Sequence, residues 1–415
     1  MSTIEPNNST ENQRVAIVGT LANTMLGFRG ELIRDLVASG HTVFAFAIDY
    51  TPVTEQEIRA MGAAPVSYRM GQLSTNPLTD IKAMLQLYRL FKERAITLSY
   101  CYFSKPAIYG TLAAKLAGVT TRVAKIEGLG RVFTRHPGGD KLKKRILRMI
   151  MAALFRISLP HAHKVLVLNE GDKQDLQSFS KKIPEPTVLG GIGVCLKRYP
   201  FRPPVTAPVR FIFVGRLLPE KGVRYFVEAA KALKTRYPDT EFILVGAPDN
   251  KPGAINKAEL DQLVCEQVVT WPGPVEDVAP WLARSSVFVL PTYYREGVPR
   301  STQEALAMGR PVITTRMPGC RKTVREGANG YLIEPHDQAG LERAMLQFIQ
   351  HPDLIPAMGA ASYRLACEQF DVRKINRTIM QEIGLALPVV GEASSPHSAN
   401  DWPEHISAHT KVFAE

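Results

Sequence analysis

The chain has 415 residues, of which 45% are hydrophobic and 22% are charged, and its net charge is +12. This composition is ordinary for a folded protein of two domains, and it excludes bulk disorder, a collagen-like repeat and a disulfide-dense chain. No apolar run approaches the roughly 18 residues that would span a bilayer, and the first residues lack a secretory pattern. The five cysteines are scattered, which predicts reduced thiols in the cytoplasm.

The excess of positive charge is confined to the first half. Residues 1–200 hold 27 Lys and Arg against 15 Asp and Glu, whereas the remaining residues hold 24 of each kind. Such an imbalance indicates that the first half meets an anionic partner, such as nucleic acid, phospholipid or a phosphorylated ligand.

Apolar strands alternate with amphipathic helices along the first half, a pattern typical of parallel sheets covered by helices on both faces. We predict strands at 14–20, 41–49, 96–102, 121–126 and 164–168, and helices at 28–38, 78–94, 106–117 and 140–157. Gly27 would then lie in the loop that follows the first strand.

A Pro-rich stretch predicts a linker, after which the alternation restarts with strands at 209–215, 241–246, 268–271, 287–290 and 311–315. We therefore predict an α/β fold of two facing Rossmann-like domains, each a doubly wound parallel sheet, with a ligand cleft between them. The predicted bounds are a disordered N-terminus at 1–13, an N-terminal acceptor-binding domain at 14–195 with the helix at 371–386 as a candidate addition, a linker at 196–208, a C-terminal donor-binding domain at 209–370, and a disordered tail at 388–415.

Two motifs in the second half carry the predicted chemistry. In the first, Gly215-Arg216 leaves a strand, and Lys221-Gly222 opens a helix. A helix N-terminus favours phosphate, and two cations beside it can neutralise a diphosphate. Taken alone, a solvated turn with surface charges explains this motif equally well.

The second motif places one carboxylate, Glu296, in a loop and another, Glu304, in the following helix, where Pro299 suits the first position. Carboxylates accept hydrogen bonds from pairs of hydroxyls, so both could bind a sugar or a ribose. For either residue alone, a helix-dipole contact or simple solvation would be the simpler explanation.

Taken together, the two motifs resemble those of the retaining glycosyltransferases of family 4. Glu296 and Glu304 have seven residues between them, as in the E-x7-E motif of that family, and Arg216 and Lys221 match its diphosphate motif. Asn329-Gly-Tyr-Leu is similar to a strand of the same family, and the resemblance covers residues 14–386. It implies the GT-B fold, a nucleotide-diphosphate sugar as donor, and transfer with retention of configuration.

The resemblance also implies roles for individual residues. Arg216 and Lys221 would hold the diphosphate and stabilise the leaving group, Glu304 would bind the ribose, and Glu296 would bind the donor sugar. Further donor-binding candidates are Gly27, Gly215, Gly297 and Val298, although a turn glycine explains Gly27 equally well. No cofactor and no metal is expected, since the chain has no Asp-x-Asp motif.

In the first half, Lys125-Ile-Glu127-Gly128-Leu-Gly130 resembles a bacterial subgroup that adds N-acetylgalactosamine or a related hexose to undecaprenyl-diphosphate-linked glycans. The subgroup implies a polyprenyl-linked acceptor, a UDP-sugar ahead of a GDP-sugar, and a place in O-antigen, capsule or exopolysaccharide synthesis. Glu127 could contact the acceptor hydroxyl or act as its base, which would make it a catalytic residue. An ion pair with Lys125 or Arg131 explains Glu127 equally well.

A basic amphipathic stretch runs from Lys141 to Arg156 with six cations and no acid. It predicts contact with an anionic membrane surface, and hence a peripheral position on the inner face of the cytoplasmic membrane. The alternative is a helix that buries its apolar face and leaves its cations in water. The membrane-contact candidates are Lys141, Lys143, Lys144, Arg145 and Arg148.

Three other functions are alternatives for this sequence. A GDP-mannose-type donor with a different acceptor keeps the reaction class. A nucleotide-sugar 2-epimerase keeps the fold but lacks this pairing of motifs. An RNA-binding protein would use the basic half, yet the basic stretch lacks interleaved aromatic residues, so no nucleic-acid partner is expected.

Overall fold

The computed structural model describes residues 12–71, 76–135, 138–249 and 253–386, which form two compact units. The first unit contains residues 12–193, the tripeptide Arg295–Gly297 and the segment that begins at Val372. The second unit contains Val194–Tyr294 and Val298–Asp371. The predicted disordered ends lie outside the described residues, apart from Asn12 and Gln13.

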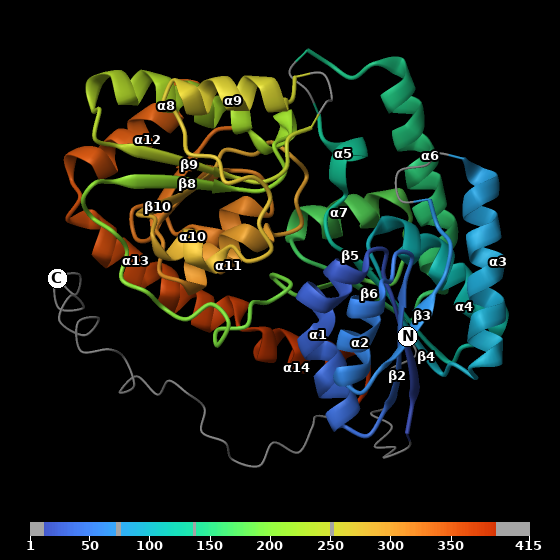
Figure 1. The fold of residues 1–415 in the computed structure, drawn as a ribbon. Coiled ribbons are helices and arrows are strands. Elements are labelled where there is room, and N and C mark those ends of the chain that lie inside the picture. Colours follow the sequence, from blue (N-terminus) through green and yellow to red (C-terminus); the bar gives the residue numbers. More distant parts are fainter. Residues whose placement is uncertain (1–11, 72–75, 136–137, 250–252, 387–415) are drawn as a thin grey trace. The chain divides into compact units, whose positions relative to one another are not determined.

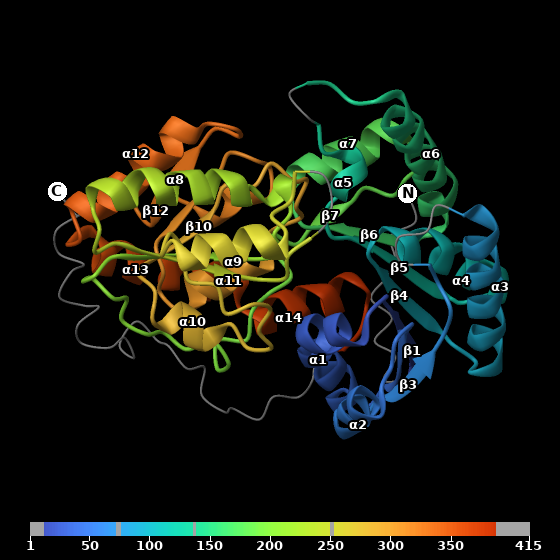
Figure 2. The same cartoon turned by 45° about the horizontal axis from the view of Figure 1, so that its top comes forward.

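The first unit is built on a seven-stranded parallel sheet in the order β3-β2-β1-β4-β5-β6-β7. Helices α1 and α2 lie on one side of this sheet and α3 and α4 on the other (Figure 2). Its elements are β1 (Arg14–Val18), α1 (Ala22–Ala38), β2 (Thr42–Ala47), α2 (Pro52–Ala60), β3 (Ala64–Ser67), α3 (Pro77–Glu93), β4 (Leu98–Tyr102), η1 (Pro106–Gly110), α4 (Thr111–Ala117), β5 (Thr121–Ile126), α5 (Gly130–Phe133), α6 (Leu142–Ser158), η2 (Leu159–His161), β6 (Lys164–Val167), α7 (Glu170–Phe179), β7 (Thr187–Val188) and α14 (Val372–Glu382).

The second unit is built on a five-stranded parallel sheet in the order β12-β11-β10-β8-β9. Helices α8 and α12 cover one face of the sheet, and α11 and α13 cover the other (Figure 1). Its elements are β8 (Arg210–Val214), η3 (Pro219–Lys221), α8 (Val223–Arg236), β9 (Glu241–Val245), α9 (Lys257–Cys265), α10 (Ala279–Ala283), β10 (Val287–Leu290), α11 (Arg300–Ala307), β11 (Val312–Thr315), η4 (Cys320–Thr323), β12 (Gly330–Ile333), α12 (Gln338–Gln350), α13 (Leu354–Leu365) and η5 (Ala366–Phe370).

Both units therefore have the predicted α/β architecture, and the physical reason is the composition of the strands. The central strands β1, β4, β8 and β10 are almost wholly buried, because helices cover the sheet on both faces. Each sheet also has a switch point, where the chain order reverses between β1 and β4 and between β8 and β10. Loops at the carboxyl ends of these strands are where such folds bind ligands.

The first helix begins earlier than predicted. α1 starts at Ala22 rather than at Phe28, so Gly27 lies within the helix and not in a loop. The N-cap residue is Leu21, whose side chain makes no capping hydrogen bond. Instead, the Ala22 amide donates to the Asp49 carboxylate at 2.7 Å. The start was missed because its cap comes from a residue 27 positions away rather than from a local Ser, Thr, Asp or Asn.

The predicted strand at 268–271 is wrong. It is reduced to a single bridge between Ile243 and Thr270, in which the Thr270 amide donates to Phe242 O and its carbonyl accepts from Leu244 N. Pro272 directly follows the predicted strand, and because it has no N–H it cannot extend a ladder of hydrogen bonds.

The Pro-rich stretch at 196–208 is not a separate linker but a part of the second unit. The guanidinium of Arg310 is fully buried and donates to the carbonyls of Arg202, Leu282, Ser285 and Met308. Phe201 packs against Tyr363 with ring centroids 5.3 Å apart. Composition alone predicted a linker because these partners lie more than 80 residues further along the chain.

Candidate active site

The two motifs follow the strands that flank the switch point of the second unit, β8 and β10. β8 pairs with β10 through Phe211 and Val287, so the loops after both strands lie at the same edge of the sheet. The loops are joined by one backbone carbonyl. Glu220 O accepts hydrogen bonds from Thr292 Oγ1 at 2.9 Å, Tyr293 N at 2.9 Å and Tyr294 N at 3.0 Å.

A glycine makes this junction possible. Gly222 has a φ of +80°, and a Cβ at this position would overlap the carbonyl of Pro291, the residue that follows β10. Any other residue would combine a left-handed backbone with a steric clash. The loop that carries Arg216 and Lys221 can therefore approach β10 only because residue 222 is glycine.

The two cations of this loop differ in exposure. Arg216 is exposed, whereas Lys221 is half-buried, with its Nζ 5.8 Å from the ring centroid of Tyr294. Gly215, Arg216 and Lys221 thus lie within one loop at the switch point, where two positive side chains precede the N-terminus of α8. This arrangement is suited to an anionic ligand.

Glu304 is largely buried, whereas the simpler explanation expected a solvated side chain. Its side chain is only 11% exposed and accepts a hydrogen bond from Arg300 Nε at 2.9 Å. It also hydrogen-bonds Tyr199, whose pKa is raised by burial first and then by the charge of Glu304. Sequence reasoning missed Arg300 and Tyr199, although the i, i+4 spacing of Arg300 and Glu304 is a readable signal.

The start of α11 agrees with the prediction to within one residue, because Pro299 is the N-cap and Arg300 is the first helical residue. The side-chain Nε2 of Gln303 donates to Val298 O at 3.1 Å, which closes the turn before the helix. Val298 is buried with an exposure of 4%, and its role in donor binding stays a prediction.

Glu296 and Gly297 belong to the first unit, as part of the tripeptide Arg295–Gly297. The backbone N–H of Gly130 donates to Arg295 O at 3.1 Å, and the side-chain Nδ2 of Asn169 donates to Gly297 O at 2.7 Å. A Cβ on Gly128 would overlap Gly297 N, so the backbones of the two segments pack directly against each other. The structure therefore brings together Gly297 and the Glu127–Gly130 turn, which the sequence had placed in different motifs.

Glu127 lies in a buried cluster of charges. Its carboxylate, 4% exposed, forms ion pairs with Arg29 and, at 3.1 Å, with Lys125. The Arg29 guanidinium lies 4.4 Å from the ring centroid of Tyr102, and burial raises the pKa of Tyr102 to about 12. Burial, together with the charge of Arg29, lowers the pKa of Lys125 well below its usual range. The ion pair with Lys125, which was the alternative explanation of Glu127, is thus present. Arg29 is a second partner that the sequence did not reveal.

Gly27, within α1, has open space where a Cβ would stand, so nothing in its surroundings requires glycine. Its proposed close approach to a diphosphate stays a prediction.

The basic stretch forms α6, whose cations are of two kinds. Lys144 and Arg148 pair with Asp140, and their hydrogen bonds lower the pKa of this carboxyl to about 2. They also donate to the carbonyls of Thr134 and Val132, so they hold the preceding turn in place. The cations of α6 and its N-cap that are exposed are Lys141, Lys143, Arg145 and Arg156.

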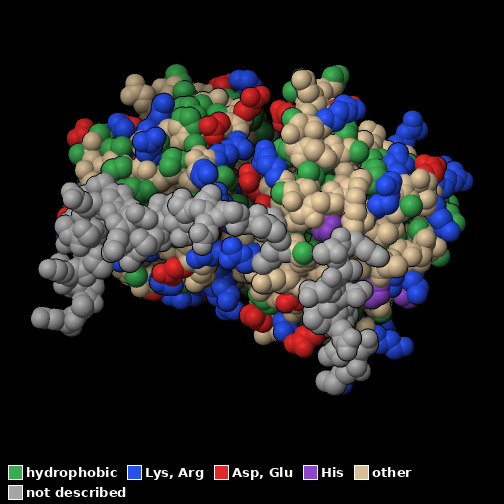
Figure 3. Space-filling model, turned by 90° about the horizontal axis from the view of Figure 1, so that it is seen from below, with side chains coloured by type: hydrophobic (Ala, Val, Ile, Leu, Met, Phe, Trp, Pro, Cys, Tyr) green, Lys and Arg blue, Asp and Glu red, His purple; other side chains and the backbone are tan. Residues whose placement is uncertain are grey.

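The outward face of α6 is apolar. Five large residues with exposures between 47% and 71% recur at helical spacing along it, namely Leu142, Ile146, Met149, Ile150 and Ile157. The opposite face is also apolar, since Phe155 is fully buried and Met151 and Leu154 pack against the core. The alternative in which α6 buries its whole apolar face is therefore wrong. On the first unit, at the right of Figure 3, Lys and Arg side chains predominate along the outer border.

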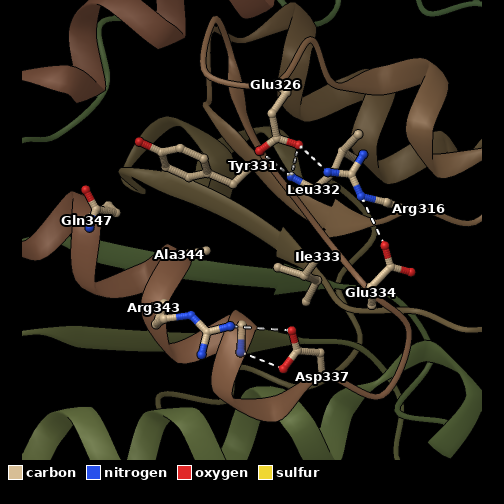
Figure 4. A pocket seen from close by; sticks show the side chains of 11 residues that line it. Arg316, Glu326, Tyr331, Leu332, Ile333, Glu334, Asp337, Arg343, Ala344 and Gln347 are labelled. Carbon is tan, nitrogen blue, oxygen red and sulfur yellow. Dashed lines mark hydrogen bonds and ion pairs between the residues drawn. The ribbon is translucent and has the colours of Figure 1, made fainter.

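A hollow of about 370 Å³ lies beside the edge strand β12 and helix α12 (Figure 4). Arg316 reaches Glu326 at 3.1 Å and Glu334 at 3.2 Å, and Arg343 lies 3.7 Å from Asp337. None of the predicted site residues lines this hollow. Its two arginines pair with its three carboxylates.

Two features are absent from the residues that the structure describes. No group of three or more His, Cys, Asp or Glu side chains among them could hold a metal ion. Within the described ranges, no helix is long and apolar enough to cross a bilayer.

Comparison with known proteins agrees with this geometry. One family model, described as glycosyl transferases group 1, matches residues 208–351, and a second, described as glycosyl transferase 4-like, matches residues 15–169. The sucrose-phosphate synthase of Thermosynechococcus elongatus has the same fold, with a TM-score of 0.71 at 19% identity over 89% of this chain and 98% of that one. The chain therefore contains one domain that matches the group 1 glycosyl transferases and one that matches the 4-like glycosyl transferases, and the predicted GT-B fold and enzyme class are confirmed.

Two bacterial relatives are more similar in sequence. The N,N'-diacetylbacillosaminyl-diphospho-undecaprenol alpha-1,3-N-acetylgalactosaminyltransferase of Campylobacter jejuni is 26% identical over 333 residues, which cover 76% of this chain and 84% of the relative. The UDP-Gal:alpha-D-GlcNAc-diphosphoundecaprenol alpha-1,3-galactosyltransferase of Escherichia coli is 27% identical over 63% of this chain and 68% of its own length. The matches do not favour an epimerase or an RNA-binding protein.

Proposed function

We propose that this glycosyltransferase moves a hexose from a UDP-sugar to a polyprenyl-diphosphate-linked glycan, with retention of configuration and without a metal. The observation that carries the proposal is the junction at the switch point of the second unit. There, Glu220 O ties the loop of Arg216 and Lys221 to the loop that leads into α11. The names of the two bacterial relatives support the donor and acceptor classes.

Each motif residue then has a chemical task. Negative charge builds on the diphosphate as the bond to the sugar breaks, and Arg216 and Lys221 stabilise that charge. Glu304, oriented by Arg300 and Tyr199, accepts hydrogen bonds from the ribose hydroxyls. Glu296 binds the hydroxyls of the donor sugar. Departure of the diphosphate from the face that the acceptor attacks needs no enzyme nucleophile.

A thermal-shift and donor-hydrolysis panel of UDP- and GDP-sugars, without added metal, tests this proposal. We expect one UDP-sugar to raise the melting temperature and Lys221→Ala to abolish that shift. Lys231→Ala is the matched control, because Lys231 is an exposed residue of α8 that pairs with Glu228 in the neighbouring turn. Preference for a GDP-sugar would correct the donor, and binding of no nucleotide sugar would refute the proposal.

We propose further that α6 rests on the anionic inner face of the cytoplasmic membrane, where a polyprenyl acceptor resides. The supporting observation is its outward apolar stripe, which is flanked by exposed cations such as Lys143 and Arg145. Interfacial helices combine these two features, and each cation near anionic lipid contributes about 1 kcal/mol. Lys144 and Arg148 contribute less to this surface, because Asp140 already pairs with both.

Co-sedimentation with phosphatidylglycerol vesicles tests the membrane proposal. The double variant Ile146→Ser and Met149→Ser should lose most of the binding, since both side chains are exposed and their replacement leaves the core intact. Val53→Ser is the matched control, because Val53 is equally exposed but lies on α2. Equal binding of the double variant and the control would remove α6 from the proposal, and binding to RNA instead of vesicles would favour the other class of partner.

A further inference from the structure

The tripeptide Arg295–Gly297 is held at both ends by side chains of the first unit. At its start, the Arg295 amide donates to Thr134 Oγ1 at 2.9 Å, and the Arg295 guanidinium pairs with Asp172 and Asp175. At its end, Asn169 Nδ2 donates to Gly297 O at 2.7 Å and lies 3.4 Å from Glu296 O. Glu296 is thus the middle residue of a segment fixed on either side.

Asn169 and Asp172 act as one unit at the N-terminus of α7. Asn169 is the N-cap, and its Oδ1 accepts from the Asp172 amide at 2.9 Å. Its Nδ2 has two hydrogens, and these reach Asp172 Oδ2 at 2.8 Å and Gly297 O. Capping alone requires only the oxygen of Asn169, which Ser or Asp would also supply. The amide nitrogen is therefore available for the tripeptide, and Asp172 orients it.

Asp172 is fully buried, although it carries a carboxylate. Burial raises its pKa to about 7, with nearby Asp175 adding to the rise and Arg295 and Asn169 opposing it. A carboxyl whose pKa is higher in the folded than in the unfolded protein lowers the free energy of unfolding as the pH rises from about 4 to 7. At neutral pH and above, the charged form of Asp172 thus costs stability rather than adding to it. Stability alone does not account for an aspartate at this position.

We propose that Asn169 and Asp172 are positioning residues that fix the Glu296–Gly297 peptide for sugar transfer. The proposal rests on the proposed function, in which Glu296 binds the donor sugar. Asp172 pairs with the Arg295 side chain at one end of the tripeptide. It also accepts a hydrogen bond from Asn169 Nδ2, which donates to Gly297 O at the other end. Neither residue needs to touch the substrate. Small displacements of a substrate-binding group reduce turnover far more than they weaken binding.

The test compares Asp172→Asn and Asn169→Ser with the wild type in full-length protein. Asn169→Ser keeps a capping oxygen but removes the donor to Gly297. We expect kcat to fall at least tenfold in both variants while KM for the donor changes less than threefold. Glu170→Gln is the matched control, because Glu170 is the exposed neighbour between them on the same helical turn, and it should behave as the wild type.

Three readouts separate positioning from a merely structural role. The wild-type kcat should rise with pH through a midpoint near 7, and Asp172→Asn should lose this limb, since the charged groups that face Asp172 are Arg295 and Asp175. At pH 8 its melting temperature should equal or exceed that of the wild type. Amide hydrogen exchange in residues 294–298 should accelerate in both variants, whether or not sugar is turned over. Arg295→Lys, which keeps the charge but not the fork, should give a milder loss.

Unchanged exchange and an unchanged kcat in Asp172→Asn would overturn the inference while leaving the proposed function intact. So would a loss of kcat that only parallels a loss of melting temperature. A wild-type protein that binds no nucleotide sugar would instead refute the proposed function. Its exchange data would then still decide whether Asn169 and Asp172 fix the tripeptide.

Discussion

Each unit carries a pair of cations near its candidate site, and the two pairs have opposite environments. In the second unit, Arg216 is exposed and Lys221 is half-buried in the loop after β8. In the first unit, Arg29 and Lys125 are almost completely buried and share the carboxylate of Glu127. The same residue types are thus available to a ligand in one unit and engaged within the fold in the other.

The difference shows what burial does to a charge. An exposed cation retains its hydration and can exchange it for a phosphate oxygen at little cost. A buried cation must find its counter-charge within the protein, and removal of that partner is strongly destabilising. We therefore expect substitutions of Arg216 and Lys221 to change turnover, and substitutions in the charge cluster of the first unit to change stability.

The largest expected effect is that of Glu127→Gln. This substitution leaves Arg29 and Lys125 buried without a carboxylate and should lower the free energy of unfolding by about 3–5 kcal/mol. Urea unfolding at pH 7 measures it. Wild-type stability with a lower kcat would instead indicate that Glu127 acts on the acceptor and would break the comparison between the units.

The loss in Glu127→Gln should shrink as the pH rises. Burial lowers the pKa of Lys125, so the folded protein binds fewer protons there than the unfolded chain does. The free energy of unfolding then rises with pH until the ordinary lysine pKa of about 10.4 is reached. Without Glu127 this dependence should steepen, and unfolding at pH 7 and pH 9.5 measures the difference. A difference that does not depend on pH would assign the loss to Arg29 alone.

Lys221→Ala should reduce kcat with the donor by about 10²–10³, the usual cost of removing one group that stabilises a developing negative charge. Its melting temperature without donor should match that of the wild type, because Lys221 is only half-buried, unlike Arg29 and Lys125. Steady-state kinetics and thermal unfolding provide the two readouts. A large loss of stability would make the two cation pairs equivalent.

Gly222→Ala should lower the stability of the second unit by about 1–3 kcal/mol, because Ala must adopt a left-handed backbone and its Cβ meets Pro291 O. Gly273→Ala is the matched comparison, since Gly273 has a φ of +86° but open space at its Cβ. Thermal unfolding of both variants separates the clash from the backbone cost. Equal losses would show that the contact between the loop and β10 contributes nothing.

The smallest expected effect is that of a chelator. We expect EDTA to leave turnover of a UDP-sugar unchanged, since Arg216 and Lys221 can supply the positive charge that a metal would provide. A sugar-release assay with and without EDTA, followed by addition of Mg²⁺ or Mn²⁺, measures it. Inhibition that Mn²⁺ reverses would show that the two cations do not suffice.

The candidate site could be proposed from the sequence because its two motifs are local. The motif of Arg216 and Lys221 and that of Glu296 and Glu304 each occupy fewer than ten residues, and strand alternation placed both after strands. What could not be predicted is which segments pack together. Arg29 pairs with Glu127 across almost 100 positions, and Asn169 reaches Gly297 across more than 120.

The sequence by itself determined the α/β class, the division into two domains and the reaction class, because buried parallel strands and glycosyltransferase motifs leave local patterns. Only the tertiary structure decided that the segment at 196–208 packs into the second unit, that α1 begins at Ala22, and that Lys144 and Arg148 form ion pairs with Asp140. Each of these depends on a partner that periodicity and composition do not identify. Burial, which assigns a charge either to the fold or to a ligand, arises only when the distant segments meet.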